Sequence, residues 1–314
     1  MRLESVLTSS PKRPRKYPAA AAVSEVQASA ASRKLRRKIQ DKFALAMIVL
    51  ATLGTVGMLG WILFHIISNG LSHIDWTFLT SDYARTDADS GIWPMIVSTL
   101  YMVGLSLGIA APVGIMAAIY LTEFARPGSK LVKVVRFATE SLAGIPSIIY
   151  GLFGLTLFVS TMKLGFSILA GALTLSILIL PVIIRTTEES LLSVPQSWRD
   201  SSYALGASRV YTIWHLVLPN ALPGIVGSII LCIGRIIGES APVFLTAGMV
   251  ARIPDSVFDS GRTLTVHLYK LTQELFSISD WDQAYATATV LIILVLSLNI
   301  VTRVIASRFR KHKP

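Results

Sequence analysis

The sequence contains little charge and almost no cysteine, and both shortages narrow the class of protein. Only 15% of its 314 residues are Asp, Glu, Lys or Arg, whereas 53% are hydrophobic and the mean hydropathy is +0.61. Soluble domains carry about a quarter charged residues, so a soluble helical bundle fits this composition poorly. The single cysteine, Cys232, excludes a disulfide framework, and its apolar surroundings in the sequence are those of a small hydrophobic residue.

Sequence motifs for catalysis, nucleotide binding and metal binding are also missing. The chain has no Gly-x-x-x-x-Gly-Lys-Ser/Thr stretch, which excludes ATP binding through a P-loop. The five histidines lack the spacing of a metal site, and no nucleophile elbow, His-Glu-x-x-His helix or pair of carboxylates indicates a reaction. We therefore expect no enzyme, and no metal or other cofactor bound by this chain.

Long apolar runs are what the sequence has in abundance. A helix needs about 20 apolar residues to cross the hydrocarbon core of a bilayer. Six runs of that kind are separated by charged connections, and they cover residues 43–67, 92–121, 138–162, 164–184, 221–250 and 284–302. This pattern predicts an all-α, polytopic integral membrane protein with six transmembrane helices. We expect a membrane domain over residues 43–306, a disordered basic tail over 1–42 and a short basic tail over 307–314.

Basic residues are concentrated at the ends of the chain and in two of the connections. Residues 1–42, the connections 122–136 and 185–221 and the residues after Thr302 together hold 23 of the 29 Lys and Arg, and the other connections hold five. The positive-inside rule therefore predicts that both termini are cytoplasmic. Because the basic residues follow this pattern, the net charge of +11 indicates contact with membrane lipid rather than with nucleic acid. The cluster 33–38 is the segment expected to lie against anionic headgroups.

Glycine and proline recur inside the second, third and fourth apolar runs. Such residues allow close packing of membrane helices, and prolines bend or break them. Two interpretations remain open at this point, namely ordinary close packing or a bundle of discontinuous helices around a pathway.

The fifth apolar run carries two charged residues, Arg235 and Glu239, within the segment GRIIGES. In a continuous helix a separation of four residues places both on one face. Charges inside a membrane are costly, so they indicate a function, and an arginine fork suits an oxyanion such as phosphate or sulfate. The alternative is a structural ion pair that ties this helix to a neighbour.

The connection 185–221 is predicted to form two short helices that meet at Gly206. Ser197-x-x-Asp200 is a candidate capping box for the first helix, which would run to about Leu205 before a left-handed turn at Gly206. Ser208 is placed to cap the second helix. That helix would present an apolar face and end at two prolines, with the face formed by Val210, Ile213, Trp214, Val217 and Leu218 and the prolines at 219 and 223. A protruding knob and a helix on the membrane surface are both compatible with this pattern.

The same connection resembles the cytoplasmic docking loop of ABC importer permeases, which has the form Glu-Ala-Ala-x3-Gly-x9-Ile-x-Leu-Pro. Here it reads Asp200-Ser201-Ser202-x3-Gly206-x9-Leu216-x-Leu218-Pro219, with Asp for Glu, two Ser for Ala and Leu for Ile. The resemblance implies the type I importer permease fold and a loop that docks on a separate ATPase. The residues it assigns to docking are Trp198, Asp200, Ser201, Ser202, Ala204, Leu205, Gly206, Leu216 and Pro219.

Within that family the chain resembles the permeases of the Pst phosphate importer, on the segments 91–103, 141–154 and 234–248. The run Gly238-Glu239-Ser240-Ala241-Pro242 is similar to the A-type subunit. The resemblance implies a C-type permease partner, two ATPase subunits that bind ATP and Mg²⁺, an extracytoplasmic phosphate-binding protein and a bacterial inner membrane. It also assigns Arg235 and Glu239 to phosphate movement. A permease for sulfate, molybdate or an amino acid, and an ATP-independent channel or secondary transporter, remain alternatives.

Overall fold

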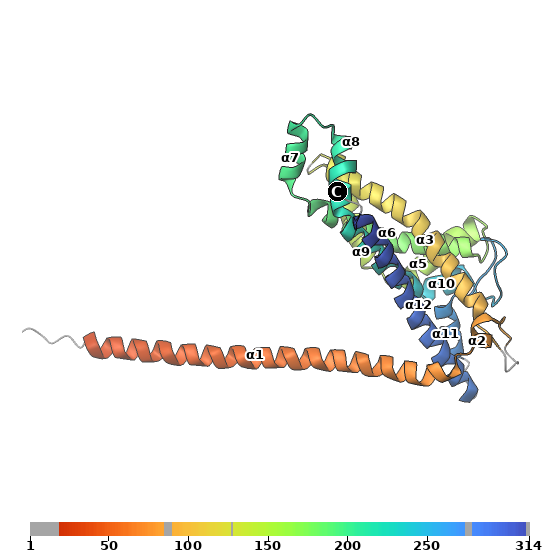
Figure 1. The fold of residues 1–314 in the computed structure, drawn as a ribbon, viewed down its shortest axis with the longest axis horizontal. Helices are drawn as coiled ribbons and strands as arrows, with labels where there is room; N and C mark the ends of the chain where they lie inside the picture. Colours follow the sequence, from red (N-terminus) through yellow and green to blue (C-terminus); the bar gives the residue numbers. More distant parts are fainter. Residues whose placement is uncertain (1–18, 85–89, 127, 274–277, 312–314) are drawn as a thin grey trace, which may run out of the picture. The chain divides into compact units, whose positions relative to one another are not determined.

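The computed structural model describes residues 19–84, 90–126, 128–273 and 278–311, and all regular structure within them is helical (Figure 1). The predicted all-α class is therefore confirmed. The chain divides into two compact units between Phe64 and His65, rather than at residue 42.

Within the described residues, the first unit is the part of α1 (Ala19–Gly70) that ends at Phe64. The remaining residues of α1, from His65 to Gly70, belong to the second unit. Residues 19–42 are helical, so the prediction of a disordered tail is wrong for this part, and residues 1–18 lie outside the described residues. An alanine-rich tract joined to an existing apolar helix extends that helix without a new nucleation step. At the other end, α12 (Ile278–Lys311) likewise continues past the predicted boundary at residue 306.

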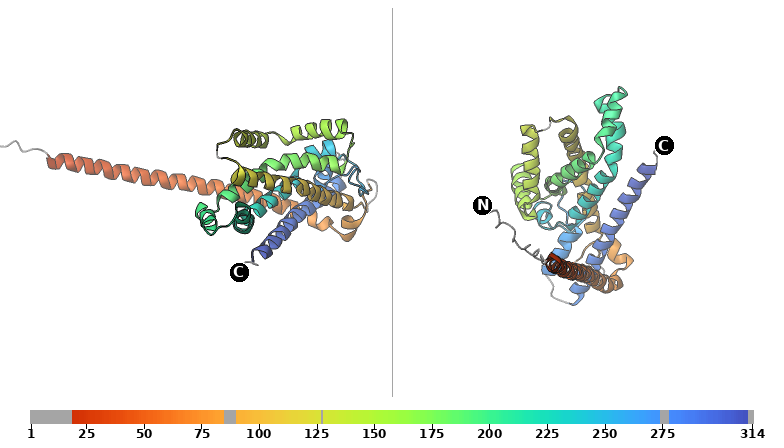
Figure 2. Two further views of the ribbon diagram at one scale, coloured as in Figure 1. Left: turned by 90° about the horizontal axis from the view of Figure 1, so that it is seen from above. Right: turned by 90° about the vertical axis from the view of Figure 1, so that its left-hand side faces the viewer.

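The second unit is a bundle centred on α6 (Ile168–Leu192), which packs between α3 (Trp93–Ile119) and α9 (Leu218–Gly238). Leu175, Ile179 and Ile183 of α6 are fully buried in its main hydrophobic cluster. At one end of the bundle lie α7 (Gln196–Ala204) and α8 (Arg209–Thr212), and α11 (Leu264–Gln273) lies toward the other (Figures 1 and 2). The remaining short elements are α2 (Trp76–Thr80), α4 (Lys130–Ala143), α5 (Ser147–Gly154), α10 (Ala241–Thr246), a 3-10 turn η1 (Leu71–His73) and three π-helical segments, η2 (Tyr120–Phe124), η3 (Leu155–Thr161) and η4 (Ile213–Val217).

The described residues contain five helical stretches that are long and apolar enough to cross a membrane, and there are six if a bent pair of helices is counted as one span. The five are 40–73, 93–124, 168–192, 209–238 and 280–304, and the pair joins Lys130–Ala143 to Ser147–Thr161 at an angle of 104°. The prediction of six spans agrees with the larger of the two counts, in which the third span is the bent pair. The fifth stretch lies over 209–238 rather than the predicted 221–250.

The bend in the third span is held by a hydrogen bond across the break. α4 ends at Ala143, and α5 begins after Pro146, which cannot continue the first helix. The Tyr150 hydroxyl donates to the Leu142 carbonyl at 2.7 Å, and the same carbonyl accepts from the Ile145 N–H at 3.1 Å.

The prediction that Pro219 and Pro223 end the second docking helix is wrong. α8 continues through η4 into α9 without interruption. The π-helical segment η4 changes the helical register before Leu218, and Pro219 lies in the first turn of α9 directly after that change. Pro223 lies inside α9 and removes a single helical hydrogen bond.

Close packing of α5 on α10 requires glycine at position 151. An added Cβ there would lie 2.9 Å from the Pro242 Cα, a backbone atom that cannot rotate away. We expect Gly151→Ala to cost about 1–3 kcal/mol by forcing the two helices apart. Thermal unfolding in detergent should show a lowered Tm, whereas Gly108→Ala, with open space around it, should not. Equal unfolding temperatures for both variants would contradict this packing.

Candidate functional site

Arg235 and Glu239 form an ion pair at a break in the fifth apolar run, with Nε and Oε1 3.6 Å apart. α9 ends at Gly238, Glu239 is extended, and α10 begins at Ala241. The expectation that both residues share one face of a continuous helix is therefore wrong, because Glu239 follows the helix end. The pair forms nevertheless, since the extended residue directs its carboxylate back toward the last turn.

The break gives Arg235 a half-buried position with compensating negative charge. Within this chain, the Arg235 side chain is 35% exposed and the Glu239 side chain 15%. The partial negative charge at a helix C-terminus also favours a cation in the last turn. Tyr150 of α5 lies close enough to interact electrostatically with the guanidinium. The site thus holds a cation in place while leaving part of it accessible to a ligand.

A small apolar cavity adjoins this break. It has a volume of about 200 Å³ and lies between α5, α10 and α11, with Ser240, Phe244 and Tyr269 among its lining residues. Because α5 follows the bend of the third span and α10 follows the break of the fifth, the two discontinuous segments pack against each other here.

The docking connection has the predicted turn but not the predicted first cap. Gly206 has φ = +83°, which confirms the left-handed turn, and the Ser208 hydroxyl accepts from the Tyr211 N–H at 3.3 Å. The capping box at Ser197 is wrong, because α7 begins after Pro195 and ends at Ala204. A proline before the helix fixes its start, and Asp200 instead accepts a bond from the Gln196 side chain at 3.1 Å.

Most residues assigned to docking are exposed on the surface of the second unit. Leu205 is 88% exposed, an unusual state for a large apolar side chain. Ser202 is half-buried, and its hydroxyl bonds that of Thr212 at 2.8 Å, which joins α7 to α8. The other exposed members are Trp198, Asp200, Ser201, Ala204 and Gly206, and Leu216 and Pro219 are half-buried.

The predicted apolar face of the second docking helix is divided. Ile213 and Val217 are buried, whereas Val210 and Trp214 are each 53% exposed. The buried side chains belong to the small hydrophobic cluster at the base of the docking element, by which we mean α7, the turn at Gly206, α8 and η4.

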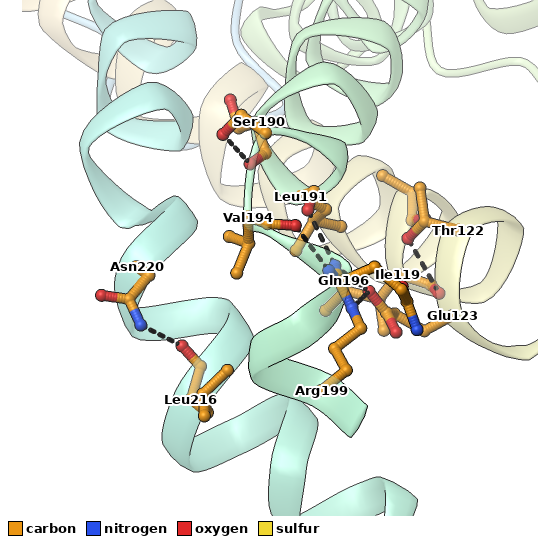
Figure 3. A network of polar contacts seen from close by, with 12 residues as sticks. Ile119, Thr122, Glu123, Ser190, Leu191, Val194, Gln196, Arg199, Leu216 and Asn220 are labelled. Carbon is orange, nitrogen blue, oxygen red and sulfur yellow. Dashed lines mark hydrogen bonds and ion pairs between the residues drawn. The ribbon is translucent and has the colours of Figure 1, made fainter. Parts of the chain in front are cut away.

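Two charged residues at that base were not predicted as site residues (Figure 3). Glu123, at the end of the second span, and Arg199 of α7 form a buried ion pair 76 residues apart in the sequence. Each looks in sequence like a solvated charge beside an apolar run. The one available signal is that Arg199 directly precedes Asp200, the acidic position of the docking pattern.

A second cluster lies in the connection before α11. Arg262 is buried, donates twice to the Met249 carbonyl, and contacts the His267 Nδ1 at 3.3 Å. Its guanidinium also lies over the Tyr83 ring, 5.4 Å from the centroid. His267 is 2% exposed, and burial, together with the charges of Arg262 and Lys270, lowers its pKa to about 3.

Solved structures with this arrangement are membrane chains of ABC importers. A chain of a bacterial alginate ABC transporter, crystallised with a pentasaccharide-bound periplasmic protein, matches with a TM-score of 0.63 and 16% identity, covering 87% of this chain and 96% of that one. A chain of the inward-facing MetNI methionine ABC transporter matches with a TM-score of 0.53 and 21% identity, covering 70% and 94%. The chain therefore shares the fold of these transporter chains.

The sequence comparisons identify the family. Residues 110–312 match the binding-protein-dependent transport system inner membrane component, and the chain belongs to that family. It is 32% identical to the phosphate transport system permease protein PstA of Haemophilus influenzae, covering 88% of this chain and 96% of the relative, and to PstA 1 of Mycobacterium tuberculosis, covering 88% and 92%. It is also 32% identical to the probable ABC transporter permease protein YqgI of Bacillus subtilis, covering 86% and 96%. The chain is thus a transporter component of the PstA group that works with ATPase and substrate-binding partners.

The buried His267 predicts a pH-dependent stability. The unfolded histidine binds a proton below about pH 6.5, whereas the folded one does so only near its lowered pKa of about 3, so stability falls as pH drops through that window. We expect a loss of about 2–3 kcal/mol between pH 7 and 4.5, measured by thermal unfolding. His267→Gln should flatten this dependence, and His215→Gln, at an exposed site, should leave it intact. A His267→Gln profile as steep as that of the wild type would contradict the assignment.

Proposed function

We propose that this chain is the A-type permease subunit of an ATP-driven importer of inorganic phosphate. The observation that carries the proposal is Arg235, an ion-paired and half-buried cation at a break in a membrane span. The PstA relatives, named as phosphate transport permeases and similar over nearly their whole length, support the cargo.

Arg235 would act as the cation of the pathway, and Glu239 would hold it. A guanidinium offers a planar set of donors that matches two phosphate oxygens. The carboxylate 3.6 Å away orients that fork and offsets part of its charge, which limits how tightly an anion is retained. Phosphate carries one to two negative charges, so a single arginine compensates only part of it. We therefore assign a second cation to the C-type permease partner.

The proposed assembly has a heterodimer of A-type and C-type permeases at its centre. Both termini and the docking element would lie in the cytoplasm, in agreement with the excess of Lys and Arg there. Two ATPase subunits would bind ATP and Mg²⁺, and one of them would contact the exposed face around Leu205 and Trp198, while this chain binds no cofactor. An extracytoplasmic binding protein would deliver phosphate from the opposite side, and anionic lipids would contact the basic segments.

Transport would proceed by alternating access. ATP closes the ATPase dimer, the docking element follows that closure, and the two permeases change from outward to inward opening around the bound phosphate. The bent third span and the broken fifth span would line the pathway, since irregular backbone within a membrane is tolerated where it is buried in protein or borders a cavity.

Removing the guanidinium tests the role of Arg235. A charge-assisted hydrogen bond contributes about 1.5–3 kcal/mol, so uptake by Arg235→Ala should fall roughly tenfold to a hundredfold. Arg235→Lys, which keeps the charge but loses the fork, should lie between the variant and the wild type. The measurement is radiolabelled phosphate uptake in cells lacking the chain and complemented with each form at equal membrane abundance.

Two controls accompany that assay. Lys42→Ala removes an exposed cation of α1 and should transport normally, and excess sulfate should not compete. Normal uptake by Arg235→Ala would refute the assigned role. Competition by sulfate would instead identify an importer of another oxyanion.

Gly206 offers a separate test of the docking element. No atom surrounds its Cα closely, but φ is +83°, so any cost of substitution is conformational. Gly206→Val should strain the turn by about 1–2 kcal/mol and reduce the amount of ATPase that copurifies, while Gly206→Asn, which tolerates this conformation, should retain it. Equal copurification with both variants would show that the turn is not needed for docking.

A further inference from the structure

The buried ion pair between Glu123 and Arg199 lies at the base of the docking element, where movement of a bound ATPase would have to reach the membrane helices (Figure 3). Two nitrogens of Arg199 bond one Glu123 oxygen, Nη2 at 2.8 Å and Nε at 3.2 Å. The same guanidinium donates to the Val194 carbonyl at 2.7 Å and to the Leu191 carbonyl at 2.8 Å. One side chain of α7 therefore holds the end of the second span and the end of α6 together.

Because the pair is buried, both charged groups need well-placed hydrogen-bond partners within the protein. Both side chains are at most 7% exposed, and a buried charge is tolerated only when it is paired and hydrogen-bonded. Apolar side chains of similar size often stabilise such a position equally well. What the ion pair adds is a fixed direction, because the planar fork and its partners define one orientation of α7.

The local helix geometry places Glu123 in this position. η2 replaces the last α-helical turn of the span, and the Ala125 N–H bonds the Tyr120 carbonyl at 2.8 Å. A π turn accommodates an additional residue and so rotates the side chains that follow it. Such turns occur frequently at functional sites.

Below the pair, a small hydrophobic cluster joins the three central helices. Its buried members come from α3, the end of α6, η4 and α9, and they include Ile119, Leu191, Val194, Ile213 and Val217. Beside the pair, a cleft of about 670 Å³ borders α7, with Gln196, Tyr203 and Arg209 among its lining residues. The hydrophobic cluster includes no residue of α7, and Glu123 and Arg199 both line the cleft. The ion pair therefore joins α7 to the end of the second span where the cleft leaves little other packing between them.

We propose that Glu123 and Arg199 are positioning residues that make α7 and α3 move as one body during the transport cycle. This inference rests on the proposed ABC importer function. Movement imposed on α7 by an ATPase subunit reaches the end of α3 through the guanidinium, and α3 carries it into its packing with α6 and α9. The Arg136–Glu188 pair provides a comparison, since it joins α4 to α6 without touching α7.

The test replaces the pair by apolar side chains in the complete transporter. Glu123→Leu/Arg199→Met keeps the volume but removes the directed bonds. Spin labels at Ser197 on α7 and Val113 on α3, both exposed, report the distance between the helices once the buried Cys232 is replaced by alanine. The transporter, with its partner permease and ATPase in lipid nanodiscs, is measured without nucleotide and with trapped ATP. Transported phosphate per ATP hydrolysed is measured in proteoliposomes.

With the pair intact, the distance distribution should be the same in both nucleotide states. In the double variant, it should shift or broaden when ATP is trapped, and phosphate transported per ATP should fall about tenfold while ATP hydrolysis continues. The control Arg136→Gln/Glu188→Gln should behave as the wild type.

An unchanged distance and an unchanged transport ratio in a stably assembled double variant would overturn the proposal, and so would equal effects in the control. If the double variant does not assemble, Arg199→Lys decides, because it keeps the charge and loses the fork. A transport ratio for Arg199→Lys equal to that of the wild type would also refute the proposal. Absence of phosphate transport by the wild type would refute the proposed cargo alone, since the distance measurement needs no cargo.

Discussion

The lack of water in the bilayer core is the constraint on which the rest of the structure depends, because each polar group there needs a partner within the protein. Where a span breaks, the chain provides one. The Tyr150 hydroxyl bonds a carbonyl at the bend of the third span, and Glu239 pairs with Arg235 at the break of the fifth. The irregular backbone on which a pathway depends is thus stabilised by the residues that flank it.

The end of the bundle that carries α7 and α8 follows the same rule. Arg199 occupies a buried position only because Glu123 and two carbonyls at the end of α6 surround it. A docking element with an exposed apolar tip and a fully bonded base is suited to transmitting force. The tip can exchange its contacts with a partner, while the base keeps one geometry.

Local signals in the sequence were sufficient for the spans, the turn at Gly206 and the proximity of Arg235 and Glu239. Each depends on hydrophobic length, on the conformational freedom of glycine or on a separation of four residues. The Glu123–Arg199 pair could not be predicted, because it joins residues far apart and no local pattern specifies long-range pairing. The π turns were also missed, so Pro219 looked like a helix end although a change of register accommodates it. Residues 19–42 are helical because they continue the apolar part of α1, and not because they have an amphipathic pattern of their own.

The exposed Leu205 has a consequence for biosynthesis. A leucine that is 88% exposed is an attractive target for chaperones and for proteases that degrade incomplete complexes. The tip of the docking element therefore marks an orphan subunit until another protein covers it. Cells that make this chain in excess of its partners should consequently adjust its abundance by degradation rather than accumulate it.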